Sequence, residues 1–104
     1  VSNSLDSFLD RDLLESVDLI VPIVTMGTIH PEQRDGVIRA IAEDGKGMAG
    51  CHGGMCDAFR NDPEWEFMTG GQWVAHPGDN NVRYTIKINR NETRSRRAST
   101  TSRL

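Results

Sequence analysis

The sequence has few cysteines, few aromatic residues and no long apolar run. Only two of its 104 residues are cysteines, Cys51 and Cys56, and 6% are aromatic. Two thiols in an acidic chain without an export signal favour a reducing cytoplasm, and a disulfide between them is the minority interpretation. No apolar stretch approaches the roughly 20 residues that span a bilayer, which argues against a membrane partner. The chain starts without methionine or a signal peptide, so we expect a cytoplasmic protein that lacks its natural beginning.

Charge is unevenly distributed along the chain. Residues 1–88 contain seven Lys and Arg against fourteen Asp and Glu, a net charge of −7, whereas residues 89–104 contain five Arg against one Glu, a net charge of +4. The acidic body excludes nucleic acid as a partner on electrostatic grounds. Because residues 89–104 have no apolar residue before Ala98, we expect a disordered basic tail after a folded body. A phosphorylation site at Ser99 and an out-of-frame continuation are the alternatives for this tail.

The order of apolar segments predicts an α/β fold with a parallel sheet. Residues 18–24 (DLIVPIV) form a continuous apolar run, which is typical of a strand buried on both faces, although Pro22 is expected to stop the regular ladder. A helix with an apolar stripe is predicted from Pro31 to a stop at Gly45. A weaker strand at residues 46–51 completes the order strand, helix, strand.

Shorter elements are predicted on both sides of this unit. They are a helical stretch at residues 5–17, a helical face made by Met55, Ala58 and Phe59, a helix at residues 63–68 ended by Gly70, an extended segment at residues 72–75, a turn at residues 76–79, and a strand at residues 81–88 with one solvated face. His30 is interpreted as a residue at the start of the long helix.

The stretch GMAGCHGGMCDAF (residues 47–59) has the order strand, sharp turn and helix that holds the catalytic side chain in a nucleophile elbow. Small residues are needed there because a Cβ beside the apex would clash. Two registers fit. Cys51 at the apex implies a thiolate nucleophile, whereas His52, flanked by Gly50 and Gly54, implies an imidazole acting as base, acid or ligand. A third interpretation is a glycine-rich corner with a buried Cys51 and an incidental histidine.

Three motifs together resemble the ThuA-like trehalose-utilisation family. They are DLIVP followed by a helix, GMAGCHGGMCDAF, and FMTGGQWVAHPGD followed by a strand, and the match runs through about residues 13–88. That family is similar to class I glutamine amidotransferases in its flavodoxin-like fold, a three-layer parallel sheet with helices on both faces. The resemblance implies a partial domain that takes part in the catabolism of trehalose or a related sugar, with a small-molecule sugar as its substrate. It also implies that amidotransferase chemistry is not retained.

The resemblance places His52 at the elbow, where amidotransferases carry cysteine. His76 is either a second catalytic group near the elbow or a histidine of a surface turn. The expected substrate-binding residues are Thr25, Met26, Gly27, Gly53, Gly54, Asp57 and Trp73. The alternative for Asp57 is a solvated charge on the face of a helix. The alternative for Trp73, and for Trp65, is a position in the hydrophobic core.

Backbone N–H groups at Thr25–Gly27 are expected to bind an oxyanion or a sugar hydroxyl, because the end of a parallel strand faces the crevice of such a sheet. No metal site is predicted, since the spacing of Cys51, His52 and Cys56 matches no standard zinc pair. The sequence names no cofactor.

The small number of strands, together with missing family segments on both sides, leads us to expect a fragment of a longer domain. A homo-oligomer is one expectation for the full-length parent. Two alternatives to sugar chemistry at an imidazole stay open. One is a non-catalytic sugar-binding or interaction module, and the other is a Cys-dependent amidotransferase or hydrolase-like enzyme.

Overall fold

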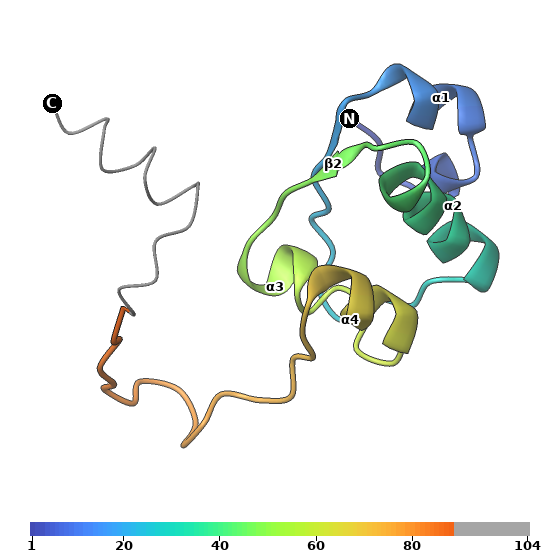
Figure 1. The fold of residues 1–104 in the computed structure, drawn as a ribbon. Coiled ribbons are helices and arrows are strands. Elements are labelled where there is room, and N and C mark those ends of the chain that lie inside the picture. The colour runs from blue at the N-terminus through green and yellow to red at the C-terminus, as the bar shows by residue number, and fades with distance from the viewer. Residues whose placement is uncertain (89–104) are drawn as a thin grey trace, which may run out of the picture.

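The computed structural model describes residues 1–88, and the expectations for the tail at residues 89–104 lie outside these described residues. In chain order the elements are the 3-10 helix η1 (Leu5–Phe8), α1 (Arg11–Ser16), β1 (Leu19–Ile20), α2 (Pro31–Ala42), β2 (Gly47–Met48), α3 (His52–Met55) and α4 (Pro63–Thr69) (Figure 1). None of the helices among residues 1–88 has the length and apolar composition needed to cross a bilayer.

The centre of the fold is a parallel pair of strands joined by a helix. Leu19 lies opposite Gly47 and Ile20 opposite Met48, and α2 makes the connection between the two strands. The predicted order strand, helix, strand is therefore confirmed, and with it an α/β arrangement. Two strands make up the sheet within the described part of the chain.

The prediction that residues 18–24 are buried on both faces is wrong. Ile20 and Pro22 are buried, but Leu19 and Val21 are exposed, and Ile23 is 86% exposed. Burial alternates along residues 19–23, as in a strand with one covered face. Regular pairing ends before Pro22, as expected for a residue that has no N–H to donate.

The predicted strand at residues 81–88 is also absent from the structure. All eight of these residues are exposed and none belongs to a strand or helix. A strand is stable only when its backbone groups pair with a neighbour, and residues 81–88 have no such neighbour within the described residues. The expected extended segment at residues 72–75 likewise has no regular structure, whereas the turn at residues 76–79 is confirmed by the bond from the Asp79 N–H to the His76 carbonyl.

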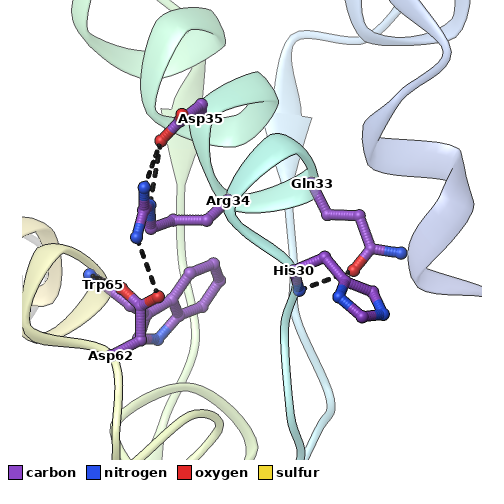
Figure 2. Close-up of polar contacts among 6 residues, drawn as sticks. All are labelled: His30, Gln33, Arg34, Asp35, Asp62 and Trp65. Atoms are coloured by element: carbon purple, nitrogen blue, oxygen red, sulfur yellow. Dashed lines mark hydrogen bonds and ion pairs between the residues drawn. The ribbon is translucent and has the colours of Figure 1, made fainter.

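Helix α2 forms where its sequence predicts. Pro31 opens the helix, where its missing N–H costs no hydrogen bond. His30 precedes it as the N-cap, and its own N–H donates to the Gln33 side chain at 3.0 Å (Figure 2). Val37 and Ala40 are fully buried on the inner face, and Gly45, in a left-handed conformation, follows the end of the helix.

Helix α4 is fixed to α2 by a polar clasp at its N-terminus. Asp62 caps α4 by accepting a hydrogen bond from the Trp65 N–H at 2.9 Å, and its second oxygen pairs with Arg34 of α2 at 3.1 Å (Figure 2). Such a cap satisfies a backbone donor that the helix itself leaves free. The clasp therefore holds two helices that lie far apart in sequence against each other.

The core beside this clasp is aromatic. The Trp65 ring is 1% exposed and meets Phe59 edge-to-face, with ring centroids 4.7 Å apart. Its Nε1–H donates to the Met55 carbonyl at 3.1 Å. The core interpretation of Trp65 is thus confirmed. Helix α3 is shorter than the predicted helical face, yet Ala58 and Phe59 are buried as that face requires.

Candidate functional site

The turn after β2 carries His52 at its apex. Cys51 is extended, with φ −148° and ψ 159°, whereas His52 has φ 51° and begins helix α3. A left-handed φ is uncommon for a residue with a Cβ and stores strain of about 1–3 kcal/mol, which is typical of residues held up at a functional turn. The positive φ falls on His52 and not on Cys51, the two residues between which the sequence leaves the apex open.

Close packing around this turn explains Gly50. A Cβ at Gly50 would lie 2.7 Å from the Met55 Cβ, and one at Gly54 would lie 3.4 Å from the Pro22 carbonyl oxygen. Contacts under about 3 Å require the backbone or a neighbour to move, so Gly50 tolerates no side chain without a shift. Gly50 is therefore a steric requirement of the bend, whereas a Cβ at Gly54 would make only ordinary contact.

The turn opens into a cavity of about 650 Å³. Most of the residues predicted for the site line it, namely Thr25, His52, Gly53, Gly54, Asp57, Trp73 and His76. Met26 and Gly27 do not. The cavity lies between the end of the segment that follows β1, the elbow with α3, and the loop after α4, so residues that are distant in sequence meet there.

Trp73 lies near both histidines of the cavity. Its ring centroid is 6.4 Å from that of His52, at an interplanar angle of 46°, and 4.8 Å from that of His76, at 79°. The 4.8 Å pair has the edge-to-face geometry that aromatic rings favour. Trp73 is half-buried while both imidazoles are exposed, so one wall of the cavity combines an apolar surface with two proton-carrying groups.

Asp57 and Arg60 form a charged pair in the wall of the same cavity. Asp57 is 6% exposed, and both of its oxygens accept hydrogen bonds from Arg60, one of them from Nη2 at 2.9 Å. The interpretation of Asp57 as a solvated charge is therefore wrong. Hydrogen bonds from Arg60 lower the pKa of Asp57 despite its burial, with smaller contributions from charge on His52 and His76.

Two backbone N–H groups of the loop at Thr25–Gly27 bond to other parts of the chain and are not donors for a ligand. The Met26 N–H donates to the Asp57 carbonyl at 2.8 Å, and the Gly27 N–H donates to the Ala58 carbonyl at 2.7 Å. These two N–H groups are thus occupied, which corrects the expectation that they bind an oxyanion or a sugar hydroxyl. The Thr25 hydroxyl donates to the Gly53 carbonyl at 3.2 Å and holds the loop against the elbow.

Three polar residues of the cavity were missed by sequence reasoning. They are Arg60, Asp79 and Asn80. The i, i+3 spacing of opposite charges at Asp57 and Arg60 is the signal for the first, because such residues meet on a helical turn. Asp79 and Asn80 stand in a glycine-containing turn, and nothing in their sequence pattern distinguishes them from ordinary turn residues.

Both cysteines are free, as expected from the interpretation that a disulfide between them is the minority case, and both are exposed. Neither lines the cavity, although Cys51 is the neighbour of His52. The interpretation of Cys51 as a buried residue of a glycine-rich corner is therefore wrong. Residues 1–88 contain no cluster of three or more His, Cys, Asp or Glu side chains arranged to hold a metal ion.

These features describe an α/β unit in which His52 lines a mixed polar and aromatic cavity. The family model named ThuA and described as trehalose utilisation matches residues 1–100. The chain therefore belongs to the ThuA family, and the resemblance drawn from its three motifs is confirmed. No curated protein and no solved structure matches the chain.

Proposed function

We propose that this ThuA-family domain binds trehalose or a related sugar in the cavity beside His52. The observation that carries the proposal is the left-handed conformation of His52, a strained arrangement that brings an imidazole to a cavity shared with a half-buried tryptophan. Family membership supports the choice of ligand, because the family is described by trehalose utilisation.

The cavity suits a sugar because a pyranose has an apolar face and a polar rim. The Trp73 ring offers the apolar face a surface to stack on, as aromatic side chains with large contact area commonly do. Asp79 and Asn80 supply acceptors and donors for hydroxyl groups, and Arg60 adds a cation whose geometry is fixed by Asp57. The polar groups that set orientation thus surround the ring that supplies contact area.

The proposed chemistry is proton transfer by His52. Its neutral imidazole takes a proton from a sugar carbon next to a carbonyl, so that the C–H bond breaks, an N–H bond forms and the electron pair moves onto the carbonyl oxygen. His76, which meets Trp73 edge-to-face, donates a hydrogen bond to that oxygen as negative charge develops. The reaction therefore calls for an oxidised sugar, one that already carries a carbonyl group.

The whole domain is proposed to have the flavodoxin-like architecture of class I glutamine amidotransferases and to act in the cytoplasm. The parallel β1–β2 pair with its helical crossover is a building unit of such sheets and supports this view. The net charge of −7 on residues 1–88 supports a small-molecule partner over nucleic acid.

The test is calorimetric titration of the protein with trehalose and with its keto derivative, paired with a turnover assay. His52→Gly removes the imidazole and suits the left-handed backbone, so folding is preserved while binding weakens and turnover ceases. His30→Asn, at the start of α2 and away from the cavity, is the matched control and leaves both unchanged. Equal affinity and turnover in wild type and His52→Gly would refute the proposal.

Two other outcomes of the same titration identify the alternatives. Sugar binding that depends on Trp73 but proceeds without turnover identifies a non-catalytic sugar-binding module. Loss of activity after treatment with iodoacetamide identifies a Cys-dependent enzyme. Since Cys51 lies outside the cavity lining, we expect activity to survive this reagent.

A further inference from the structure

Arg60 is the one lysine or arginine among the described residues that line the cavity beside His52. Asp57 holds its guanidinium in place, because Nε and Nη2 of Arg60 each donate a hydrogen bond to one of the two carboxylate oxygens. The Asp57 side chain is 8% exposed and that of Arg60 is 38% exposed. The cation is therefore anchored in the wall by a buried partner, unlike a loose pair of surface charges.

The pair with Asp57 uses one edge of the guanidinium of Arg60 and leaves the other edge available. A guanidinium carries five N–H groups. Two of them are donated to Asp57, and the remaining three, two on Nη1 and one on Nη2, make no hydrogen bond with the described residues. Side by side, the N–H groups of Nη1 and Nη2 form a second fork of the same kind as the one that Asp57 occupies.

The shape and the charge of this second fork select the chemical class of its partner. Two parallel N–H groups that carry positive charge match the two oxygens of a carboxylate, whereas a sugar hydroxyl offers one oxygen and no charge. The cavity lining holds one further carboxylate among the described residues, Asp79, which accepts the Asn80 N–H at 2.8 Å and forms no ion pair with Arg60. The fork is thus left to a ligand of the cavity.

The charges of the lining favour a carboxylate over a phosphate at this fork. Asp57 already balances the charge of Arg60, and Asp79 adds a negative charge to the described part of the cavity wall. A singly charged carboxylate gains two charge-assisted hydrogen bonds against modest repulsion. A phosphate ester carries a charge of about −1.5 to −2 at neutral pH and meets stronger repulsion from the same two side chains.

We propose that Arg60 is a specificity-determining residue that binds a carboxylate on the sugar, so that the ligand of the cavity is a sugar acid. This inference rests on the proposed function, because it assigns one more chemical group to the sugar that binds beside His52. The carboxylate is held at Arg60 while the apolar face of the sugar stacks on Trp73. These two contacts together fix the orientation of the ring in the cavity.

The test compares two ligands that differ only in the proposed group. They are trehalose and the sugar acid obtained from it by oxidation of one hydroxymethyl group to a carboxylate, and calorimetric titration of the full chain measures the affinity of each. We expect the acid to bind at least about ten-fold more tightly than trehalose, because its hydrogen bonds join two charged groups. Added salt is expected to weaken binding of the acid and to leave binding of trehalose unchanged, since salt screens the charges.

A substitution of Arg60 tests the fork itself. Arg60→Lys keeps a positive charge for Asp57 but removes the planar pair of donors, so the ratio of the two affinities is expected to fall toward one. A general loss of stability weakens both ligands alike and leaves this ratio unchanged. Arg34→Lys is the matched control, since Arg34 pairs with Asp62 at 3.1 Å outside the cavity lining (Figure 2), and it is expected to keep the wild-type ratio.

The outcomes separate this inference from the proposed function. Four results would each overturn the role of Arg60 while sugar binding stands. They are equal affinities for trehalose and its acid in wild type, an affinity for the acid that does not change with salt, a wild-type ratio in Arg60→Lys, and tighter binding of a phosphate ester of trehalose than of the acid. Failure of both trehalose and its acid to bind would refute the proposed function, and this inference with it.

Discussion

The ring of Trp73 meets the imidazole of His76 edge-to-face, with centroids 4.8 Å apart, and lies 6.4 Å from the imidazole of His52. One aromatic side chain therefore lies near both histidines of the cavity. Loops are mobile unless side chains pack against them, and the loop that carries Trp73 and His76 has no helix or strand of its own. The Trp73 contacts are accordingly what ties this loop to the elbow.

Replacement of Trp73 by alanine is expected to weaken sugar binding at least roughly ten-fold, about 1.4 kcal/mol, because both the stacking surface and the loop contact are lost. Titration calorimetry with trehalose measures the change. Phe67→Ala is the control, since Phe67 is an exposed aromatic residue of α4 outside the cavity lining. A Trp73→Ala protein that binds as tightly as Phe67→Ala would exclude Trp73 from the binding surface.

Substitution of Gly50 by alanine is expected to destabilise the protein by about 1–3 kcal/mol, because the added Cβ meets the Met55 Cβ at 2.7 Å and the turn must distort. Gly71→Ala provides a matched control, since a Cβ there meets no atom within 4 Å. Its effect is expected to stay within about 0.5 kcal/mol. Urea unfolding of both variants measures the difference, and equal midpoints would show that the turn is not tightly packed.

The elements whose signals are local were predictable from the sequence. Pro31 and the apolar stripe behind it are sufficient to define α2, and Gly70 ends α4 in a left-handed conformation as its position predicts. For the turn at residues 50–54 the sequence left two registers open, because the spacing of glycines shows where a side chain would clash but does not choose between Cys51 and His52 as the apex. The positive φ of His52 is a backbone property that the order of residue types does not report.

The failures share a different cause. Burial of residues 18–24 and pairing of residues 81–88 both depend on partners that are remote in sequence, and the pattern of a segment does not report whether its partner is present. Arg60 was missed for a related reason, because its role comes from a specific contact with Asp57 and not from residue type. A charged residue such as Asp57 is expected to be solvated from its type alone, whereas tertiary packing buries it.

Acid is expected to destabilise the protein through Asp57. Its pKa is lowered from the ordinary value of 3.8, so the folded state binds this proton less readily than the unfolded chain. The stabilisation from Asp57 is therefore fully present above that ordinary value and is lost as the pH falls through the lowered pKa. Melting temperatures of wild type and Asp57→Asn should differ at neutral pH and converge in strong acid.

Asp44→Asn is the control for this pH series, because the Asp44 side chain makes no ion pair or hydrogen bond with the described residues. Its melting temperature is expected to follow that of wild type at every pH. A difference between wild type and Asp57→Asn that stays constant into strong acid would show that the carboxylate charge of Asp57 does not contribute to stability.

Replacement of Trp65 is expected to lower the stability of the protein and to weaken sugar binding at the turn that carries His52. Trp65→Ala removes a fully buried ring and should cost about 3–5 kcal/mol, a large part of the stability of a small domain. Trp65→Phe keeps the aromatic contact with Phe59 but loses the hydrogen bond to the Met55 carbonyl at the end of α3, a loss of about 1 kcal/mol beyond the smaller ring. Because Met55 packs against Gly50 beneath the bend, Trp65→Phe should also weaken sugar binding, measured by calorimetry on protein that is still folded. A Trp65→Phe protein with lower stability but unchanged sugar affinity would show that Trp65 does not support the turn at His52. Unchanged stability in Trp65→Ala would contradict the position of Trp65 in the core.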